Sequence, residues 1–345
     1  MSVERQRIAV ITGPTASGKS GAALQAALAV GGSIINADSV SVYEDFNIGS
    51  SKPSAADLKL VPHYLVSRCR PTEDFNAGVF SSMADEAIAA IRSAGRLPLV
   101  VGGTGLYISA LLGGLIDTGK VSDDAKEQIA LRVRGFAGEQ SEVALELHRW
   151  LTELDPLSAQ QLNPRDSARV VRALEVFLST GESLAELQRE HVSSPRYDAL
   201  IAAILPPRDE LYKAIDDRVD RMIADGLLDE VESLLQRYPA NARAFASIGY
   251  SHAAAFINQQ IPYEQMLNDM KRDTRRFAKR QLTWWRNQPG KLGWHILEPV
   301  DYGHSEGDSA EMITDIVARF FESERPFFRP GSICFLKLSS ADSCD

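Results

Sequence analysis

Short apolar runs bounded by glycine or proline recur along the chain, at residues 8–11, 33–36, 97–101 and 200–205. Continuous runs of this length are typical of strands that are buried on both faces of a sheet. Segments with helical periodicity follow the first three runs, near residues 19–31, 75–94 and 105–113. This alternation predicts a parallel α/β sheet whose strands are joined by right-handed helical crossovers.

The strand pattern stops between about residue 123 and residue 191. Apolar residues in this stretch recur at helical spacing, first at residues 144–154 and then at residues 170–178. The pattern predicts an all-helical insertion domain at residues 123–195, which divides the sheet domain into a first part at 1–122 and a second part at 196–324. In the second part we expect helices at 209–225, 227–237 and 263–287, a last strand at 294–297 and a helix near 309–323. Residues 325–345 are rich in proline and serine, which predicts a peripheral or disordered tail.

Composition narrows the class of protein. Of the 345 residues, 44% are hydrophobic and 24% are charged, as in a globular protein of two domains or one large α/β unit. Three scattered cysteines without a CxxC pair argue against a disulfide framework and a structural zinc site. The apolar runs are far shorter than the ~20 residues of a membrane span, and the charged N-terminus has no cleavage pattern. We therefore expect a cytoplasmic protein with no membrane partner.

One segment matches the phosphate-binding pattern G-x-x-x-x-G-K-[ST], between the first apolar run and an Ala-rich helical segment. Its glycines allow backbone N–H groups to wrap a diphosphate or triphosphate at the positive end of the helix. The lysine adds a charge on the terminal phosphate, and the last serine can hold Mg²⁺. The predicted phosphate-binding residues are Gly13, Pro14, Thr15, Ala16, Ser17, Gly18, Lys19 and Ser20, with Ser20 as the metal ligand.

The ends of two neighbouring predicted strands carry further candidate chemistry. The run at residues 97–101 leads into Gly102, Gly103 and Thr104 without the carboxylate that a hydrolysing ATPase usually places there. This favours transfer of a group from a bound phosphate ester, although a simple strand-to-helix turn is the alternative. Asp38 follows the second run and should face the same crevice, where a carboxylate can accept a proton or reach Mg²⁺. A role as a turn or N-cap residue is the alternative.

Charge is distributed unevenly along the chain. A net charge of −9 would ordinarily argue against a nucleic-acid partner. Residues 271–291, however, contain eight Lys and Arg and one acid, Asp273, so this stretch carries +7 and the rest of the chain −16. On a helix, cations seven residues apart such as Lys279 and Arg286 would lie on one line, roughly opposite an apolar line that includes Trp284. The pattern predicts a helix that packs on the protein with one face and meets nucleic-acid phosphates with the other.

Two arginine clusters are each open to two interpretations, phosphate binding or ion pairs with neighbouring carboxylates. The first cluster shares one face of a predicted helix and consists of Arg165, Arg169 and Arg172. The second follows the fourth apolar run and consists of Arg208, Arg218 and Arg221. The two interpretations are balanced for the first cluster. For the second cluster, pairing with nearby aspartates is favoured, although a guanidinium there can clamp a pyrophosphate leaving group.

These motifs together resemble the bacterial tRNA dimethylallyltransferases over roughly residues 8–300. The phosphate-binding loop alone is shared by many folds, but its combination with the other segments is highly specific. The matching segments are 13–20, 37–43, 48–53, 62–63, 101–107, 169–175, 248–250 and 279–286. The chain departs from the family pattern at Ser41, where Gln is common, at Tyr64, where a second His is common, and at Ser251 and His252, where a basic residue and Glu are common.

The resemblance implies a P-loop NTPase-like parallel sheet flanked by helices, with the helical insertion domain facing tRNA. Dimethylallyl diphosphate, rather than ATP, would occupy the loop. Its dimethylallyl group would pass to the exocyclic N6 amine of the adenosine immediately 3′ of a tRNA anticodon, in an enzyme that acts as a monomer with Mg²⁺. By analogy with the family, Asp38 resembles the base that holds and deprotonates the amine. Thr104 resembles the residue on the bridging oxygen of the diphosphate, and Arg218 resembles the arginine on the departing pyrophosphate.

The resemblance also implies a set of tRNA contacts, which includes the aromatic pair Trp284 and Trp285. A tryptophan can stack on a base, but from the residues alone a role as a buried core anchor is favoured for both. The full set is Asp38, Ser39, Val40, Ser41, Thr104, Lys126, Ala168, Arg169, Val170, Val171, Arg172, Ala246, Ser247, Ile248, Gly249, Tyr250, Ser251, Lys279, Arg280, Gln281, Leu282, Thr283, Trp284, Trp285 and Arg286.

Three other functions compete with this one. A small-molecule kinase of the shikimate-kinase type also pairs a phosphate loop with a Gly-rich strand end, and it predicts consumption of ATP. That function leaves the basic helix and the helical insertion without a role. A prenyltransferase for free AMP would not need the basic helix either. A non-catalytic RNA-binding module would not need Lys19 beside Asp38 and Thr104.

Overall fold

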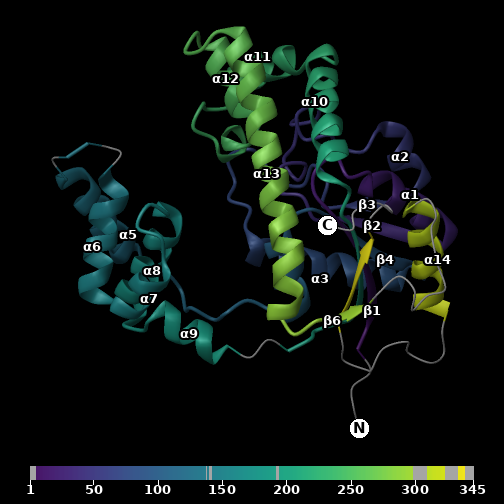
Figure 1. The fold of residues 1–345 in the computed structure, drawn as a ribbon, viewed down its shortest axis with the longest axis horizontal. Helices are drawn as coiled ribbons and strands as arrows, with labels where there is room; N and C mark the ends of the chain where they lie inside the picture. The colour runs from purple at the N-terminus through teal and green to yellow at the C-terminus, as the bar shows by residue number, and fades with distance from the viewer. Residues whose placement is uncertain are drawn as a thin grey trace. The chain divides into compact units, whose positions relative to one another are not determined.

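Figure 1 shows the chain as a computed structural model, which describes residues 5–136, 138–139, 142–191, 194–297, 309–322 and 333–338. The chain forms two compact units. The larger one comprises Met1–Gly114 and Pro195–Asp345, and the smaller one comprises Leu115–Ser194. The smaller unit starts before the expected residue 123, because the segment ahead of its first helix is hydrogen-bonded to it: the Arg172 guanidinium donates to Thr118, and the Ser122 amide donates to Ser179.

A single parallel sheet forms the larger unit, with the strand order β3-β2-β4-β1-β5-β7-β6. All of its strand pairs are parallel. The four predicted apolar runs are its four adjacent strands β2, β4, β1 and β5, so the fold class is confirmed. The strands are β1 (Arg7–Thr12), β2 (Gly32–Asn36), β3 (His63–Tyr64), β4 (Leu97–Gly102), β5 (Asp198–Ile204), β6 (His295–Leu297) and β7 (Ile333–Leu338).

Both faces of the sheet are buried, as the continuous apolar runs predict. Successive residues of β1 alternate between two hydrophobic cores: Ile8 and Val10 belong to one, and Ala9 and Ile11 belong to the other. The helices α1 (Lys19–Ala29) and α14 (Ser309–Glu322) pack against each other and cover the second core. The buried side of α1 consists of alanines, which let the helix lie close to the sheet. The first core is covered by α3 (Ala77–Ser93), α4 (Gly105–Gly113) and parts of the helices between residues 208 and 291.

The expectation of a peripheral tail at residues 325–345 is wrong for β7 (Ile333–Leu338). This strand pairs with β5 on one side and with β6 on the other, and the Cys334 and Leu336 side chains are fully buried. Pro and Ser dominate the composition around it, but six residues with one charge are enough for a strand that is buried on both faces. The rest of the predicted tail, at 325–332 and 339–345, lies outside the described residues.

Four helices follow β5 and carry the site residues of the second half of the chain. They are α10 (Arg208–Ala224), α11 (Leu227–Arg237), α12 (Tyr250–Ile257) and α13 (Tyr263–Lys291). Helix α13 runs four residues past its expected end and includes Pro289. Its buried side is formed by Met266, Met270, Ala278, Gln281, Leu282, Trp285 and Pro289, so the apolar line expected through Trp284 lies at the border of the buried face. None of the described helices is both long and apolar enough to span a bilayer.

The smaller unit is all-helical in its described residues, as the apolar spacing predicts. Its helices are α5 (Asp123–Gly135), α6 (Val143–Leu154), α7 (Pro156–Gln161), α8 (Ser167–Thr180) and α9 (Leu184–Glu190). They pack around a small core of Leu147, Leu151, Val170 and Leu174, among others. Two of the residues that set the predicted spacing, Leu154 and Leu178, lie at the edge of this core. A segment of about 80 residues thus has a hydrophobic core of its own.

Candidate active site

The phosphate-binding loop joins β1 to α1 in a conformation that requires its glycines. Gly18 has a φ of 83° and Gly13 a φ of 149°, both in the region that disfavours a Cβ atom. A Cβ on Gly13 would lie 2.4 Å from the Ile204 carbonyl oxygen. The Ser17 hydroxyl is buried and has no hydrogen-bond partner among the described residues. A loop held this tightly, with an unsatisfied hydroxyl and the free N–H groups of a helix N-terminus, is suited to bind an anion.

Lys19 lies at the start of α1 with its Nζ 3.0 Å from the Pro14 carbonyl oxygen, to which it donates. The pKa of Lys19 is lowered to about 8, chiefly by burial and also by the nearby Arg218 guanidinium, while Asp38 opposes both effects. The site therefore carries positive charge that no carboxylate fully compensates. An anion in the loop would supply the missing charge.

Asp38 forms the turn that its sequence position allowed, and it also lines the cavity of the site. Its Oδ1 accepts hydrogen bonds from the amides of Val40 at 2.8 Å and Ser41 at 3.1 Å, which is a turn of the Asx type. The turn fixes the carboxylate at the carboxyl end of β2, where Asp38 lines the same cavity as Lys19. Oδ2 takes no part in the turn, so it is available as a proton acceptor.

The loop, Asp38, residues 50–53 and residues from elements that include β2, β3, β4, α10 and α13 line a cavity of about 400 Å³. It brings together all the predicted diphosphate-binding residues from Thr15 onward, the base candidate Asp38 and the predicted arginine Arg218. Thr104 is not among the lining residues. It is the N-cap residue of α4, and its side chain makes no capping hydrogen bond. The cavity is also lined by residues that were not predicted as site residues from the sequence. They include Asn36, Ser50, Ser51, Lys52, Pro53, Asp57, His63 and Phe277.

Arg218 faces this cavity rather than an aspartate, so the favoured interpretation of the second arginine cluster is wrong for this residue. Its neighbour Asp216 pairs with Arg275, and Asp220 pairs with Lys271, so α13 occupies both carboxylates. Burial lowers the pKa of Arg218, while the negative charge of Asp38 raises it. A largely buried guanidinium without an ion-pair partner among the described residues is a strong candidate for binding a phosphate group.

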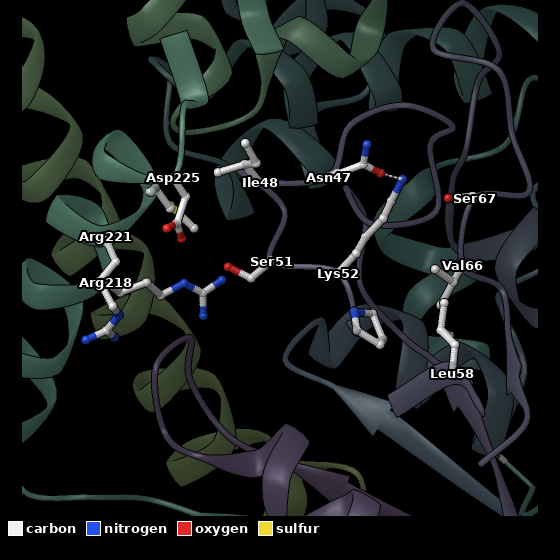
Figure 2. Close-up of a pocket in the computed structure, with 12 residues that line it drawn as sticks. Asn47, Ile48, Ser51, Lys52, Leu58, Val66, Ser67, Arg218, Arg221 and Asp225 are labelled. Atoms are coloured by element: carbon white, nitrogen blue, oxygen red, sulfur yellow. Dashed lines mark hydrogen bonds between the residues drawn. The ribbon is translucent and has the colours of Figure 1, made fainter. Parts of the chain in front are cut away.

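A second cavity of about 600 Å³ adjoins the first and is shown in Figure 2. Arg218, Ser51, Lys52 and Pro53 line both cavities. In Figure 2 the Arg218 guanidinium extends toward Ser51, and Lys52 extends away from it to donate to the Asn47 side chain. Burial lowers the pKa of Lys52 to about 8, against the raising effect of three carboxylates, of which Glu230 is the strongest. The segment 48–53, which the sequence marked only through its resemblance, is thus a wall of the site.

The cavity suits a magnesium ion that shares its ligands with a phosphate. Within the described part of the chain, no group of three or more His, Cys, Asp or Glu side chains could hold a metal ion. Ser20 nevertheless lines the cavity together with the carboxylates of Asp38 and Asp57. Mg²⁺ is commonly held by one or two protein oxygens, waters and the phosphates of its substrate. The donor set present here fits that mode and does not form an all-protein cage.

The cations in the first part of the basic stretch of α13 form ion pairs with carboxylates, and those in the second part have no ion-pair partner among the described residues. Asp269 and Asp273 on the same helix and Asp216 and Asp220 on α10 compensate the first four cations, which are Lys271, Arg272, Arg275 and Arg276. The excess of positive charge that the sequence shows is therefore compensated by carboxylates in this first part of the stretch. The exposed side chains without an ion-pair partner among the described residues are Lys279, Arg280, Arg286 and Lys291.

Several of the predicted tRNA contacts have buried side chains. Tyr250 is fully buried, donates to Glu230 and packs on Phe46. Trp285 is fully buried and stacks on Phe335. These two side chains stabilise the core, and their burial keeps them from tRNA. For Trp285 this is the role as a buried core anchor that the residues alone favoured. Val170 and Leu282 are buried in the same way, while Gly249 has no side chain to offer. Ser41 is also buried, but it lines the cavity, and its hydroxyl accepts a hydrogen bond from the Asn36 side-chain amide, 2.8 Å away.

The other predicted tRNA contacts, apart from the buried Gln281, are exposed or half-buried. In the smaller unit, Arg169 pairs with Asp166, and Lys126 pairs with Asp123, so the ion-pair alternative is realised there. Exposed pairs of this kind contribute about 0–1 kcal/mol and are readily exchanged for a phosphate partner. Arg172 pairs with Glu175 in the same way, and Arg165 is exposed. The remaining half-buried or exposed residues are Ser39, Val40, Ala168, Val171, Ala246, Ser247, Ile248, Ser251, Thr283 and Trp284.

Comparison with known proteins places this geometry in a family. The model of the IPP transferase family matches residues 41–288. The chain is 44% identical to tRNA dimethylallyltransferase 1 of Trichlorobacter lovleyi over 83% of this chain and 92% of that protein. It is 41% identical to the tRNA dimethylallyltransferase of Geobacter sulfurreducens over 92% and 97% of the two chains.

Solved structures that resemble this chain belong to proteins with similar names. The tRNA isopentenylpyrophosphate transferase of Staphylococcus epidermidis is 31% identical, with a TM-score of 0.61 over 92% of this chain and 99% of that chain. A eukaryotic dimethylallyltransferase acting on tRNA is 25% identical, with a TM-score of 0.76 over 94% and 82% of the two chains. This chain therefore belongs to the IPP transferase family.

Proposed function

We propose that the chain is a tRNA dimethylallyltransferase. It transfers the dimethylallyl group of dimethylallyl diphosphate to the exocyclic N6 amine of the adenosine immediately 3′ of the anticodon, and it releases diphosphate. The observation that carries the proposal is that Lys19, Arg218 and Asp38 line one cavity. Two cations for a diphosphate and a carboxylate for an amine proton are what this reaction needs. The tRNA substrate makes the cytoplasm the expected compartment, and we propose that the monomer is the active form.

The diphosphate is held by the loop amides, Lys19 and Arg218. As the allylic carbon–oxygen bond breaks, positive charge builds on the allylic group and negative charge builds on the diphosphate. Lys19 and Arg218 stabilise that charge, and partial burial strengthens their effect. Ser20 would hold Mg²⁺ on the diphosphate, and the metal would neutralise further negative charge. Thr104 lies next to Gly103 at the edge of the site, and its contact with the bridging oxygen stays a prediction.

Asp38 orients and deprotonates the amine. Its Oδ1 is held in the turn, so Oδ2 is the atom that accepts a hydrogen bond from the N6 amine. As the nitrogen attacks the allylic carbon, a carbon–nitrogen bond forms, the carbon–oxygen bond breaks, and one N6 proton passes to Oδ2. The adenine must leave the anticodon stack to reach this position. The free cations of α13 can hold the neighbouring phosphates while it does so.

One assay tests the function against its competitors. The protein is incubated with labelled dimethylallyl diphosphate, ATP, AMP and bulk tRNA, and the label and the ATP are followed separately. We expect label in tRNA at one adenosine per modified molecule, with ATP unchanged. Label in AMP but not in tRNA would assign the chain to the free-nucleotide prenyltransferases. ATP turnover without prenylation would assign it to the small-molecule kinases.

The lowered pKa of Lys19 predicts that diphosphate binding takes up a proton. Near pH 8 about half of the Lys19 side chains are neutral, because the pKa is about 8 instead of 10.5. A bound diphosphate favours the charged form, so binding should take up as much as about half a proton per site at pH 8 and should weaken as the pH rises further. Calorimetry in two buffers of different ionisation enthalpy measures this uptake.

The variant Lys19→Arg is the control for proton uptake, because its charge does not titrate in this range. Lys52 also lines the cavity and has a pKa of about 8, so any uptake that persists in Lys19→Arg belongs to Lys52. Equal proton uptake in the wild type and in Lys19→Arg would show that Lys19 does not contact the diphosphate. Buffer-independent binding in the wild type at pH 8 would show the same.

A further inference from the structure

Gln281 was expected on the tRNA side of the basic helix, but its side chain points into the protein. It lies on the inner face of α13 and is 8% exposed. Its Oε1 accepts a hydrogen bond from the Thr15 amide at 2.9 Å. Its Nε2 donates to the Gly103 carbonyl oxygen at 3.0 Å. One amide group of α13 thus holds the phosphate-binding loop and the turn that follows β4.

This contact is closely packed as well as hydrogen-bonded. A Cβ atom on Gly103 would lie 2.3 Å from Gln281 Nε2 and 2.9 Å from the Gly13 carbonyl oxygen. The loop that contains Gly13 and the turn that contains Gly103 leave the carboxyl ends of two adjacent strands, β1 and β4. Glycine at residue 103 is therefore needed to let Gln281 reach both segments. Because two directed hydrogen bonds hold a planar amide between them, a shift of α13 must shift the loop or break a bond.

The same helix turn carries the cations that are free for a nucleic acid. Lys279 and Arg280 immediately precede Gln281, and Arg286 follows within two turns. All three are exposed, without an ion-pair partner among the described residues. Trp285, buried between Gln281 and Arg286 in the chain, anchors this part of α13 in the core. The outer face of α13 is thus suited to phosphates, and its inner face contacts the diphosphate loop.

We infer that Gln281 is a positioning residue that couples tRNA docking on α13 to the geometry of the phosphate-binding loop. The inference rests on the proposed function for the identity of the two ligands. A tRNA phosphate on Lys279, Arg280 or Arg286 fixes the helix, and Gln281 then fixes the Thr15 amide and the Gly103 carbonyl. The loop amides beyond Thr15 are thereby held for a diphosphate. Because coupling between two binding sites is reciprocal, bound diphosphate should tighten tRNA binding by the same factor.

The test measures binding rather than turnover. The dissociation constant of inorganic diphosphate is determined by calorimetry with and without a saturating anticodon stem-loop, for the wild type, Gln281→Met and Gln281→Glu. Met has a similar length without hydrogen bonds. Glu keeps the acceptor for Thr15 but loses the donor to Gly103. Gln288→Met, on the same helix and away from the cavity, is the matched control, and thermal unfolding checks that each variant is folded.

We expect the stem-loop to tighten diphosphate binding about tenfold in the wild type and in Gln288→Met, and less than twofold in Gln281→Met, because two hydrogen bonds are lost. Gln281→Glu should behave like Gln281→Met or bind diphosphate still more weakly, because it adds a negative charge to the cavity. Stem-loop affinity without diphosphate should change less than twofold in every variant. If Gln281→Met lost the same factor of diphosphate affinity with and without the stem-loop, the inference would be overturned. A contact that only supports the loop structure would weaken diphosphate binding equally in both cases. Undiminished coupling in both Gln281 variants would overturn it too.

The proposed function is judged separately, by prenyl transfer in the wild type. A wild type that couples the two ligands without transferring a prenyl group would contradict the proposed function and leave the coupling by Gln281 standing. A wild type that transfers the group while Gln281→Met keeps full coupling would contradict the inference alone.

Discussion

Asp38→Asn should lower the rate of prenyl transfer by about 10³-fold while diphosphate still binds with near wild-type affinity. A positioned general base contributes about 10²–10⁴-fold, and an amide cannot accept the N6 proton. Asparagine keeps the oxygen that accepts hydrogen bonds from the Val40 and Ser41 amides, so the turn survives. Single-turnover transfer to tRNA and calorimetry with inorganic diphosphate give the two values.

Asp38→Ala should lose transfer to the same extent or more, because it removes both the proton acceptor and the turn. The matched control is Asp74→Asn, which removes a carboxylate that pairs with Arg243 away from the cavity. If Asp38→Asn also abolishes binding of diphosphate in the presence of Mg²⁺, Asp38 is a metal ligand rather than the base. Retention of more than about a tenth of the activity would remove it from the chemistry altogether.

The double variant Lys279→Ala/Arg286→Ala should weaken tRNA binding by about ten- to a hundredfold at low salt and flatten its salt dependence. Each phosphate contact contributes about 0.7 to the slope of log K against log salt on a single strand, so the loss of two contacts should reduce the slope by about 1.4. Both side chains are exposed, so the substitution should leave the fold intact. Filter binding or anisotropy over a range of salt concentrations measures the slope.

The same helix offers a matched control for charge. Arg272→Ala/Arg276→Ala removes the same two units of positive charge, but both arginines already pair with Asp273. We expect this second pair to change tRNA affinity less than threefold, with little change in slope. Equal effects of the two double variants would mean that tRNA responds to the net charge of α13 and not to its free cations.

The phosphate-binding loop and the central strands were predictable because their determinants are local. Gly13, Gly18 and Lys19 are close in sequence, and the conformation of the loop follows from which residues tolerate positive φ. Runs such as residues 97–101 are continuous because β4 is buried on both faces, and this requirement shows in a few consecutive residues. Asp38 was predictable for a similar reason, since parallel strands present their carboxyl ends at one edge of the sheet.

The partner of each arginine was not predictable in the same way. Within α10, Arg218 and Arg221 look alike in sequence, and Asp216 and Asp220 each lie two residues from Arg218. The approach of α13 decides the outcome, because Lys271 and Arg275 take the two aspartates and leave Arg218 to the cavity. Likewise, β7 is too short to stand out in a Pro- and Ser-rich segment, and it is stabilised by pairing with β5 and β6.

By itself the sequence determined a parallel sheet with a phosphate loop, a helical insertion and a basic helix, because helical and strand periodicity and turn chemistry act over a few residues. Only the packed structure shows which charges of that helix lack an ion-pair partner, that Arg218 lines the cavity at the phosphate-binding loop, and that Gln281 binds the loop instead of facing outward. Those outcomes depend on hydrogen bonds and ion pairs between residues as far apart as Thr15 and Gln281. Such contacts exist only when the chain has packed, because burial makes unpaired polar groups costly and so selects their partners.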